Sequence, residues 1–219
     1  NLTQSQFQKL NDEKSINEEN PLLGLHGIRF LLRNPELLKR ELSAIAQLKD
    51  SKKEVGVLIP KISSVYELKK VKEFMQNLKI DLKIGLILEI PSSMQLIKDF
   101  IDEGIDAVTI SGDTLAQYLL GIDKNNKETK EFYDDTNPAL MYQLDYVIRV
   151  SKRNNVRTKF FGSATNKKEM IEYLVKKGID SIIISPEKTN STSKDIKRTD
   201  KDIRQYELNK EKERQKKRN

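Results

Sequence analysis

Residues 104–124, GIDAVTISGDTLAQYLLGIDK, contain the pattern that decides the fold. Gly104 is a typical helix stop, and the apolar run Ala107–Ile110 that follows it predicts a short strand. A polar corner then leads into Leu115–Leu120, where the apolar spacing is helical. A strand, a glycine-containing corner and a helix make one βα unit, and such folds bind ligands at the carboxyl ends of their strands. Asp113, in the corner, therefore lies where a ligand would bind.

The same alternation of apolar runs and helical patterns continues along the chain. Further strands are predicted at residues 25–32, 55–60, 83–90, 156–162 and 181–185. Helices are predicted at residues 34–48, 64–78, 94–103, 139–152 and 167–177. Strands that alternate with helices of about 10–15 residues indicate parallel βα units. The fold class is therefore α/β, and both a doubly wound sheet and a (β/α)8 barrel fit this pattern.

Continuous apolar runs are typical of strands that are covered on both faces of a sheet. We therefore expect a set of strand side chains to be largely buried: Leu58, Leu86, Leu88, Val108, Ile110, Ile183 and Ile184. Two helix starts also carry local signals. Asn34 precedes Pro35, which suits a first helical position, and Ser64 stands three residues before Glu67, the spacing of a capping box.

Composition excludes several classes of protein. The chain has 219 residues and no cysteine, so it has no disulfide framework and no Cys-based metal or nucleophile site. It has no apolar run of about 18 residues or more, so we expect no membrane span. The net charge is +7, but residues 188–219 hold 12 Lys/Arg against 6 Asp/Glu and thus account for +6. The rest is nearly neutral, so a nucleic-acid partner for the folded part is not indicated.

We expect three segments along the chain. Residues 1–19 form a polar lead-in, residues 20–187 the folded domain, and residues 188–219 a basic tail that is disordered or helical. Residues beyond about Asn190 should pack little against the domain, because few of them are apolar. An electrostatic arm for nucleic acid or an acidic partner is the alternative for the tail. The chain starts with Asn and shows no signal-peptide pattern, so we expect a fragment, a processed product or an excised domain.

Six segments, in order, resemble the C-terminal barrel of the phosphoenolpyruvate-utilising enzymes: phosphoenolpyruvate synthase, pyruvate phosphate dikinase and enzyme I of the sugar phosphotransferase system. The resemblance is closest to phosphoenolpyruvate synthase and spans roughly residues 20–187. The segments are NPLLGLHGIRFLL (20–32), GVLIPKISSVYE (56–67), LILEIPSS (86–93), ISGDTLAQYLLGIDK (110–124), NPALMYQLDYVI (137–148) and LVKKGIDSIIISP (174–186).

The resemblance implies a (β/α)8 TIM-barrel-like domain that binds phosphoenolpyruvate or pyruvate. In the family, two βα units precede the NP-x-LG motif, whereas about 20 polar residues precede Pro21 here. The resemblance therefore implies a barrel that lacks its first one or two βα units.

The resemblance also implies a Mg²⁺ ion held by two carboxylates at neighbouring strand ends. Glu89 matches the first carboxylate. The second is the Asp of the family's N-D-L motif, and that position is Thr114 here, with Asp113 one residue earlier. Asp113 could replace the lost ligand only if the corner shifts by one residue. The alternative is that Asp113 caps the following helix, as Asp commonly does.

The substrate-binding positions are partly kept. His26 stands where the family has a phosphate-binding Arg, and a single imidazole cannot reproduce a bidentate guanidinium. Arg29 matches the second Arg of the motif, Gln117 is retained, and Lys124 replaces an Arg. The family's proton donor is a Cys, and Phe161 occupies its position. Phenylalanine has no proton to give, so general-acid catalysis is excluded there, and we predict no catalytic residue.

These observations predict that the chain is a cytoplasmic barrel derived from a phosphotransferase that acts on pyruvate and phosphoenolpyruvate. Its catalytic positions are predicted to be degenerate. Two alternatives stay open. One is an active divergent enzyme whose nucleotide-binding and phosphohistidine domains lie on a separate chain or upstream of residue 1. The other is a non-catalytic scaffold or regulatory subunit that uses the surface of the same barrel.

Overall fold

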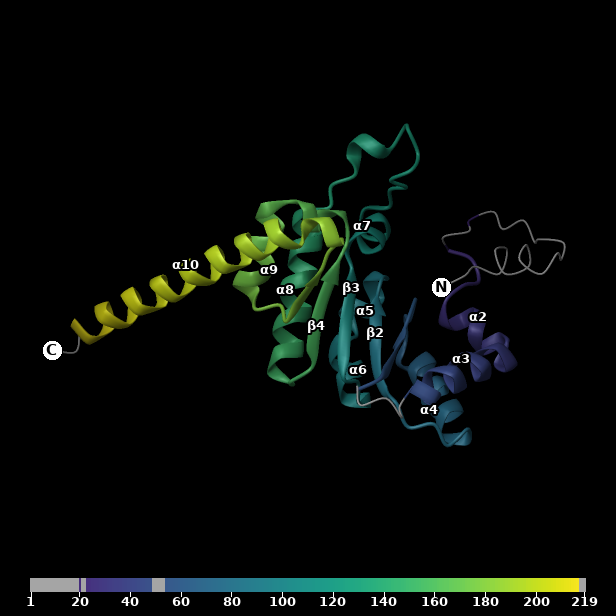
Figure 1. The fold of residues 1–219 in the computed structure, drawn as a ribbon. Coiled ribbons are helices and arrows are strands. Elements are labelled where there is room, and N and C mark those ends of the chain that lie inside the picture. Colours follow the sequence, from purple (N-terminus) through teal and green to yellow (C-terminus); the bar gives the residue numbers. More distant parts are fainter. Residues whose placement is uncertain (1–19, 21–22, 49–53, 217–219) are drawn as a thin grey trace.

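The structure is a computed structural model that describes residues 20, 23–48 and 54–216 (Figure 1). The predicted lead-in, residues 1–19, lies outside the described residues. The strands are β1 (Gly56–Ile59), β2 (Lys83–Leu88), β3 (Ala107–Ser111), β4 (Arg157–Phe161) and β5 (Ser181–Ile183). The α-helices are α2 (Ile28–Arg33), α3 (Pro35–Gln47), α4 (Val65–Asn77), α5 (Pro91–Gln95), α6 (Ile97–Glu103), α7 (Gly112–Leu120), α8 (Pro138–Arg153), α9 (Lys168–Lys177) and α10 (Thr189–Lys216).

The five strands form one sheet in the order β1-β2-β3-β4-β5, and every neighbouring pair is parallel. In a doubly wound sheet the strand order reverses, so helices cover both faces. Here consecutive strands are neighbours throughout, and right-handed crossovers place the connecting helices on one face. Those helices pack in series, α4 on α6, α6 on α8 and α8 on α9 (Figure 1). The arrangement is that of a TIM-barrel-like fold, and five of the eight strands of a closed barrel are present in the described residues.

The core lies between the sheet and this helix layer. Alternate residues of each strand point toward the helices, and the strand register aligns them: Leu86 pairs with Val108, and Ile110 pairs with Phe160. All four side chains are fully buried. Leu88 is also fully buried, so the central part of the burial prediction is confirmed.

The burial prediction is wrong at the two edges of the sheet. Leu58 on β1 is 42% exposed and Ile183 on β5 is 46% exposed, while Ile184, just after β5, is half-buried. Both exposed side chains lie on the face opposite the helices, because Leu58 aligns with Gly85 and Ile183 aligns with Phe161. That face would be the interior of a closed barrel, where the missing strands would cover it.

The strand predicted at residues 25–32 is also wrong. Within this range His26 forms a single β-bridge, and Ile28–Arg33 is helix α2. Gly27 turns the chain between them with φ of 62°, a left-handed conformation that glycine adopts without strain. The run of apolar residues was too short to separate a strand from a buried helical turn.

The helix starts follow the sequence signals in part. Ser64 accepts a hydrogen bond from the Glu67 N–H, and the Glu67 side chain accepts one from the Ser64 N–H, so the capping box is confirmed. Pro35 begins α3 as predicted. Asn34 does not cap α3 with its side chain, and instead donates to the Phe30 carbonyl, which ends α2.

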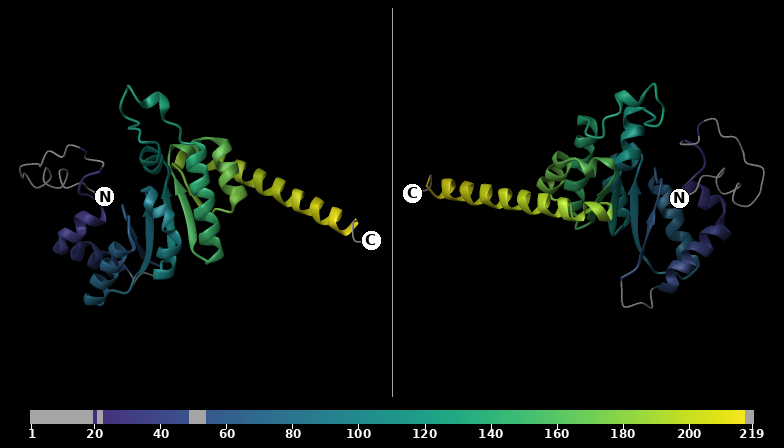
Figure 2. Two further views of the ribbon diagram at one scale, coloured as in Figure 1. Left: turned by 180° about the vertical axis from the view of Figure 1, so that it is seen from behind. Right: turned by 45° about the horizontal axis from the view of Figure 1, so that its top comes forward.

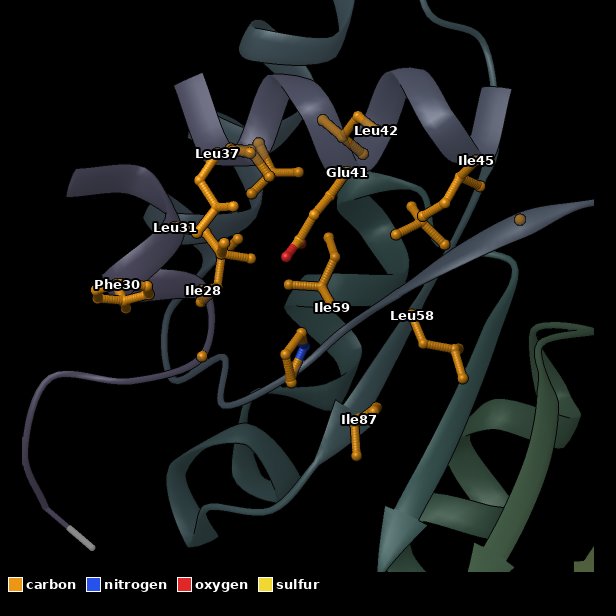
Figure 3. Close-up of a pocket in the computed structure, with 16 residues that line it drawn as sticks. Ile28, Phe30, Leu31, Leu37, Glu41, Leu42, Ile45, Leu58, Ile59 and Ile87 are labelled. Atoms are coloured by element: carbon orange, nitrogen blue, oxygen red, sulfur yellow. The ribbon is translucent and has the colours of Figure 1, made fainter. Parts of the chain in front are cut away.

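A cavity of about 570 Å³ lies between α2, α3 and β1 (Figure 3). Its walls are mainly apolar, with Leu31, Leu37 and Ile45 on the helices and Ile59 on the strand, and Glu41 points into it (Figure 3). Strand β1 is an edge strand that has one neighbour, β2, in the described part of the sheet. The cavity therefore lies along β1 at the open edge of the barrel.

Helix α10 contradicts the prediction that residues beyond Asn190 pack little. Its first turns lie along α9, where Thr192 and Thr199 are buried and Ile196 and Ile203 are half-buried. Arg198 also donates to Glu172 on α9 at 2.8 Å. The later turns extend away from the sheet, as Figure 2 shows from both sides. Within residues 20, 23–48 and 54–216, no helix combines the length and apolar character needed to cross a membrane.

Removing residues 190–219 is therefore expected to lower the melting temperature, whereas removing residues 206–219 should leave it unchanged. The longer deletion exposes the α9 surface that Thr192 and Thr199 cover, and it breaks the Arg198–Glu172 pair. A loss of about 2 kcal/mol in a domain of this size corresponds to about 4–8 °C. Calorimetric melting of the two truncated chains against the full chain measures this, and equal melting temperatures would show that α10 contributes nothing to stability.

Candidate functional site

The strand ends bring the predicted polar residues to one end of the sheet. Glu89 directly follows β2, and Asp113 lies in the first turn of α7, directly after β3. Because the two strands are parallel neighbours, their carboxyl ends lie together. The prediction that Glu89 and Asp113 lie at the same end of the barrel is confirmed. The structure nevertheless divides the polar residues between two separate groups.

The first group surrounds a pocket of about 260 Å³ at the carboxyl ends of β1 and β2, here called the β1–β2 pocket. It brings His26 and Arg29, which the resemblance singled out, next to Lys61 and Tyr118, which lie outside the predicted site. The residues that line it are Leu23, Gly24, His26, Arg29, Lys61, Ser63, Ile90, Ser92 and Tyr118. Three of these side chains are basic and none is acidic, so the pocket is suited to an anion.

Glu89 lies beside this pocket and is held by the backbone of Lys61, the residue after Pro60. Its Oε2 accepts a hydrogen bond from the backbone N–H of Lys61 at 2.9 Å, and its side chain is nearly buried. Burial raises the pKa of Glu89 above its ordinary value, and the charge and N–H of Lys61 act in the opposite direction. Its Oε1 accepts no hydrogen bond from the described residues. Within the described residues, Glu89 thus keeps one carboxylate oxygen for a ligand.

Lys61 places a charged group in the pocket. Its Nζ donates to the hydroxyl of Tyr118 at 2.9 Å and lies 4.4 Å from the centre of that ring. The Lys61 side chain is almost fully buried between β1 and α7. The sequence did contain a signal, because Lys61 is a charged residue that directly follows a buried strand and a proline.

His26 and Arg29 are both engaged within the protein. The Nδ1 of His26 lies 3.0 Å from the Gly24 carbonyl oxygen, and since a carbonyl only accepts, this nitrogen carries the hydrogen. The Nε of Arg29 donates to Glu67 Oε1 at 2.7 Å, and its Nη2 donates to the Ser63 hydroxyl. Two of the three nitrogens of the Arg29 guanidinium group therefore contact Glu67 and Ser63.

The second group, here called the Asp113 cluster, consists of Asp113, Lys124, Tyr133, Asp135, Ser163 and Lys167. Asp113 Oδ1 accepts hydrogen bonds from the N–H of Ser163 at 3.0 Å and from its hydroxyl. The same hydroxyl lies 2.9 Å from Asp135 Oδ2, and Lys167 pairs with the other oxygen of Asp135. The cluster joins the corner after β3 to the end of β4 and to the loop before α8.

These contacts use both oxygens of Asp113. Oδ2 pairs with Lys124 Nζ at 3.3 Å, and Oδ1 lies 3.4 Å from the Tyr133 hydroxyl. Partial burial acts to raise the pKa of Asp113, but the hydrogen bonds from Ser163 and the charge of Lys124 lower it below its ordinary value. Burial and the two nearby carboxylates raise the pKa of Tyr133, so its hydroxyl stays protonated as a donor.

Gln117 and Lys124, both predicted to bind substrate, contact each other. Gln117 Oε1 accepts a hydrogen bond from the Lys124 N–H at 3.1 Å, which fixes the turn after α7. Thr114, at the position of the family's metal-binding Asp, lies 3.2 Å from the Ser111 hydroxyl. Phe161, which the resemblance matches to the family's proton donor, ends β4 and is half-buried.

The corner itself depends on glycine at position 112. A Cβ there would lie 2.5 Å from Cζ of Phe160, closer than real side chains approach. The ring of Phe160 is fully buried and has no room to move away. The close approach of α7 to β4 brings Asp113 within hydrogen-bond distance of Ser163.

The described residues contain no group of three or more His, Asp or Glu side chains that could hold a metal ion. Magnesium, however, is commonly bound by one or two carboxylates together with substrate oxygens. Glu89 fits that role, because its Oε1 accepts no hydrogen bond from the described residues. Asp113 fits it only if its contacts with Ser163 and Lys124 are broken.

One protein family matches most of the sequence. The family "PEP-utilising enzyme, PEP-binding domain" matches residues 3–201. Phosphoenolpyruvate synthase from Pyrococcus furiosus is 36% identical over 180 residues, and a probable phosphoenolpyruvate synthase from Pyrococcus abyssi is 37% identical over 180 residues. In each case the match covers 80% of this chain and 22% of the synthase, so the chain spans about a fifth of the length of these relatives.

A more distant relative matches a similar share of the chain, and two solved structures have a similar fold. A phosphoenolpyruvate-protein phosphotransferase from Mycoplasma genitalium is 29% identical over 81% of this chain and 32% of that protein. RipC from Yersinia pestis has a TM-score of 0.53 at 10% identity, covering 72% of this chain and 70% of that one. A citrate lyase from Burkholderia xenovorans has a TM-score of 0.52 at 12% identity, covering 71% and 53%. Because the family match extends over nearly the entire sequence, this chain belongs to the phosphoenolpyruvate-utilising enzymes, within their phosphoenolpyruvate-binding domain.

Proposed function

We propose that this chain binds phosphoenolpyruvate or pyruvate at the carboxyl ends of β1–β3, as the binding barrel of a phosphotransferase related to phosphoenolpyruvate synthase. One observation carries the proposal: the β1–β2 pocket has three basic side chains, and Glu89 lies beside it. A small ligand with a phosphate and a carboxylate needs cationic donors for both groups. The pocket is smaller than the roughly 300–1,000 Å³ typical for drug-sized ligands, which suits a three-carbon acid.

Magnesium is part of this proposal. Glu89 would hold the ion together with substrate oxygens, and Asp113 would join it only after release from Ser163 and Lys124. When bound, the ion would neutralise charge on phosphate and enolate oxygens. Arg29 and His26 would orient the anion, and Lys124 and Gln117 would act from the turn after α7.

We further propose that the chain alone is inactive and that its catalytic positions are degenerate. The nucleotide-binding and phosphohistidine functions would come from other domains, on a separate chain or upstream of residue 1, in the cytoplasm. A non-catalytic scaffold or regulatory subunit is the second candidate. The engagement of both Asp113 oxygens favours it, because a metal ligand held this firmly by Ser163 and Lys124 serves structure more than catalysis.

Isothermal titration calorimetry with phosphoenolpyruvate, with and without MgCl₂, tests the binding proposal. We expect weak binding that Mg²⁺ strengthens, and Glu89→Gln should abolish that strengthening, because it removes the charge that the ion requires. Asp113→Asn should change the affinity by less than about threefold, since a charge already paired with Lys124 contributes little to a ligand. Asp99→Asn, on the exposed side of α6, is the matched control. An unchanged Mg²⁺ effect in Glu89→Gln would refute the role of Glu89.

A further inference from the structure

Lys61 occupies an unusual backbone position. It directly follows Pro60 at the carboxyl end of β1, and its φ is 55°, in the left-handed region that side chains other than glycine seldom adopt. The hydrogen bond from its N–H to Glu89 Oε2 holds the chain in this conformation. Strained positions of this kind gather at binding sites, where the surrounding structure fixes them for a purpose.

The side chain of Lys61 has more donors than the described protein uses. It is 7% exposed, and an ammonium group carries three N–H donors. One donor reaches the hydroxyl of Tyr118, and the charge lies over the same ring. No carboxylate of the described residues lies within 4.0 Å of its Nζ. Since buried charges in proteins are normally paired, an almost buried ammonium with two further donors points to an anion from outside.

The other two basic side chains of the pocket are committed elsewhere. Arg29 is turned to Glu67 and Ser63, and its side chain is 45% exposed at the rim. His26 gives its Nδ1 hydrogen to the Gly24 carbonyl. Lys61 is therefore the almost buried cation of the pocket whose Nζ has no carboxylate within 4.0 Å among the described residues, although the charge of Glu89 acts on it from farther away.

We propose that Lys61 binds the phosphate or carboxylate of a small anionic ligand in the β1–β2 pocket, and that it supplies the charge lost where His26 replaces an arginine. This deepens the proposed function and rests on it, because it names the principal anion-binding residue of that same site. The hydroxyls of Ser63, Ser92 and Tyr118 line the same pocket and complete a polar shell of suitable size. Lysine acts here as a point charge, which suits either anionic group.

The test compares Lys61→Met, Lys61→Arg and the control Lys98→Met in the full 219-residue chain. Lys98 is an exposed residue of α6 that pairs with Asp102. Each variant is titrated calorimetrically with phosphoenolpyruvate, pyruvate and inorganic phosphate, all with MgCl₂. Loss of a charge-assisted hydrogen bond should weaken binding about 10- to 100-fold in Lys61→Met. Lys61→Arg keeps the positive charge and should lose less affinity than Lys61→Met, and Lys98→Met should match the unsubstituted chain.

The outcomes separate this inference from the proposed function. Phosphoenolpyruvate binding that is equal in Lys61→Met and the unsubstituted chain overturns the inference and leaves the function standing. Binding of inorganic phosphate alone, dependent on Lys61, supports the inference and overturns the proposed substrate. No binding of any of the three anions overturns both.

A second measurement covers the case in which Lys61→Met fails to fold, as judged by its circular dichroism melting curve. The unsubstituted chain is acetylated with and without saturating phosphoenolpyruvate, and the rate at each lysine is read by mass spectrometry. The rate at Lys61 should fall when the ligand is present, while the rate at Lys98 should not change. An unchanged rate at Lys61, with binding confirmed by calorimetry, overturns the inference.

Discussion

The 219-residue chain, incubated with ATP, pyruvate and Mg²⁺, is expected to form no measurable phosphoenolpyruvate. The resemblance matches Phe161 to the family's proton donor, and loss of a general acid costs about 10²- to 10⁴-fold in rate. By the same resemblance Thr114 replaces a metal carboxylate and His26 replaces an arginine, and each lost electrostatic stabiliser costs about 10²- to 10³-fold. Such losses need not multiply, but the combined rate should lie at least about 10⁴-fold below that of a complete synthase.

A coupled assay of the purified chain measures this, with a full-length phosphoenolpyruvate synthase as the positive control. The curated synthases are so much longer that this chain matches about a fifth of each. Turnover above the background of a heat-denatured sample, abolished by Glu89→Ala, would mean that a working active site has been mistaken for a degenerate one.

Phe160 belongs to the core beneath the site, and its removal should strongly reduce stability. Phe160→Ala is expected to lower the free energy of unfolding by about 3–5 kcal/mol, because it leaves a large cavity in a fully buried position. Phe160 lies on β4 beside Ile110 of β3, and its ring limits position 112 to glycine. Its loss should therefore also loosen the corner that holds Asp113.

Phe161→Ala is the matched control, since it removes the same side chain one residue later on the opposite face of the sheet. Phe161 is half-buried on the face that the missing strands would cover, so its removal should cost less than half as much. Urea unfolding of both variants, followed by circular dichroism, compares the two. Equal losses would show that the open face is packed as tightly as the helix face.

Most of the fold could be predicted from periodicity. The runs at 83–90 and 107–110 gave β2 and β3, and the spacing of Ser64 and Glu67 gave the start of α4. The alternation could not distinguish a doubly wound sheet from a barrel, because both contain the same βα units. Strand order distinguishes them, and it appears only when β1 to β5 are seen to follow one another across the sheet.

The errors have local causes. The run at 25–32 is apolar enough for a strand, but a short run fits a buried helical turn equally well, and α2 forms there. Leu58 and Ile183 were expected to be buried because their runs are continuous, yet a run does not reveal whether its strand has neighbours on both sides. The low apolar content of the tail predicted little packing, and this was wrong for α10. Residues 192, 196, 199 and 203 nevertheless follow the spacing of one helix face, which indicates a packed side.

The candidate site was predictable in position but not in its contacts. Strand ends predicted that Glu89 and Asp113 lie at one end, and they do. The pairing of Arg29 with Glu67, and of Asp113 with Ser163, depends on residues far apart in the sequence, so no local pattern contains it. Lys61 lies outside the positions that the family motif marks, although a charged residue directly after a buried strand is itself a signal.

The central claim is that phosphoenolpyruvate binds at the carboxyl ends of β1–β3. Amide NMR of the ¹⁵N-labelled chain, titrated with phosphoenolpyruvate and MgCl₂, tests it most directly. Saturable shifts should concentrate at residues 61–63, 89–93 and around Tyr118, the segments that form the β1–β2 pocket and hold Glu89. Shifts confined to the apolar cavity beneath α3, around Leu37 and Ile45, or no saturable shifts at all, would contradict the account.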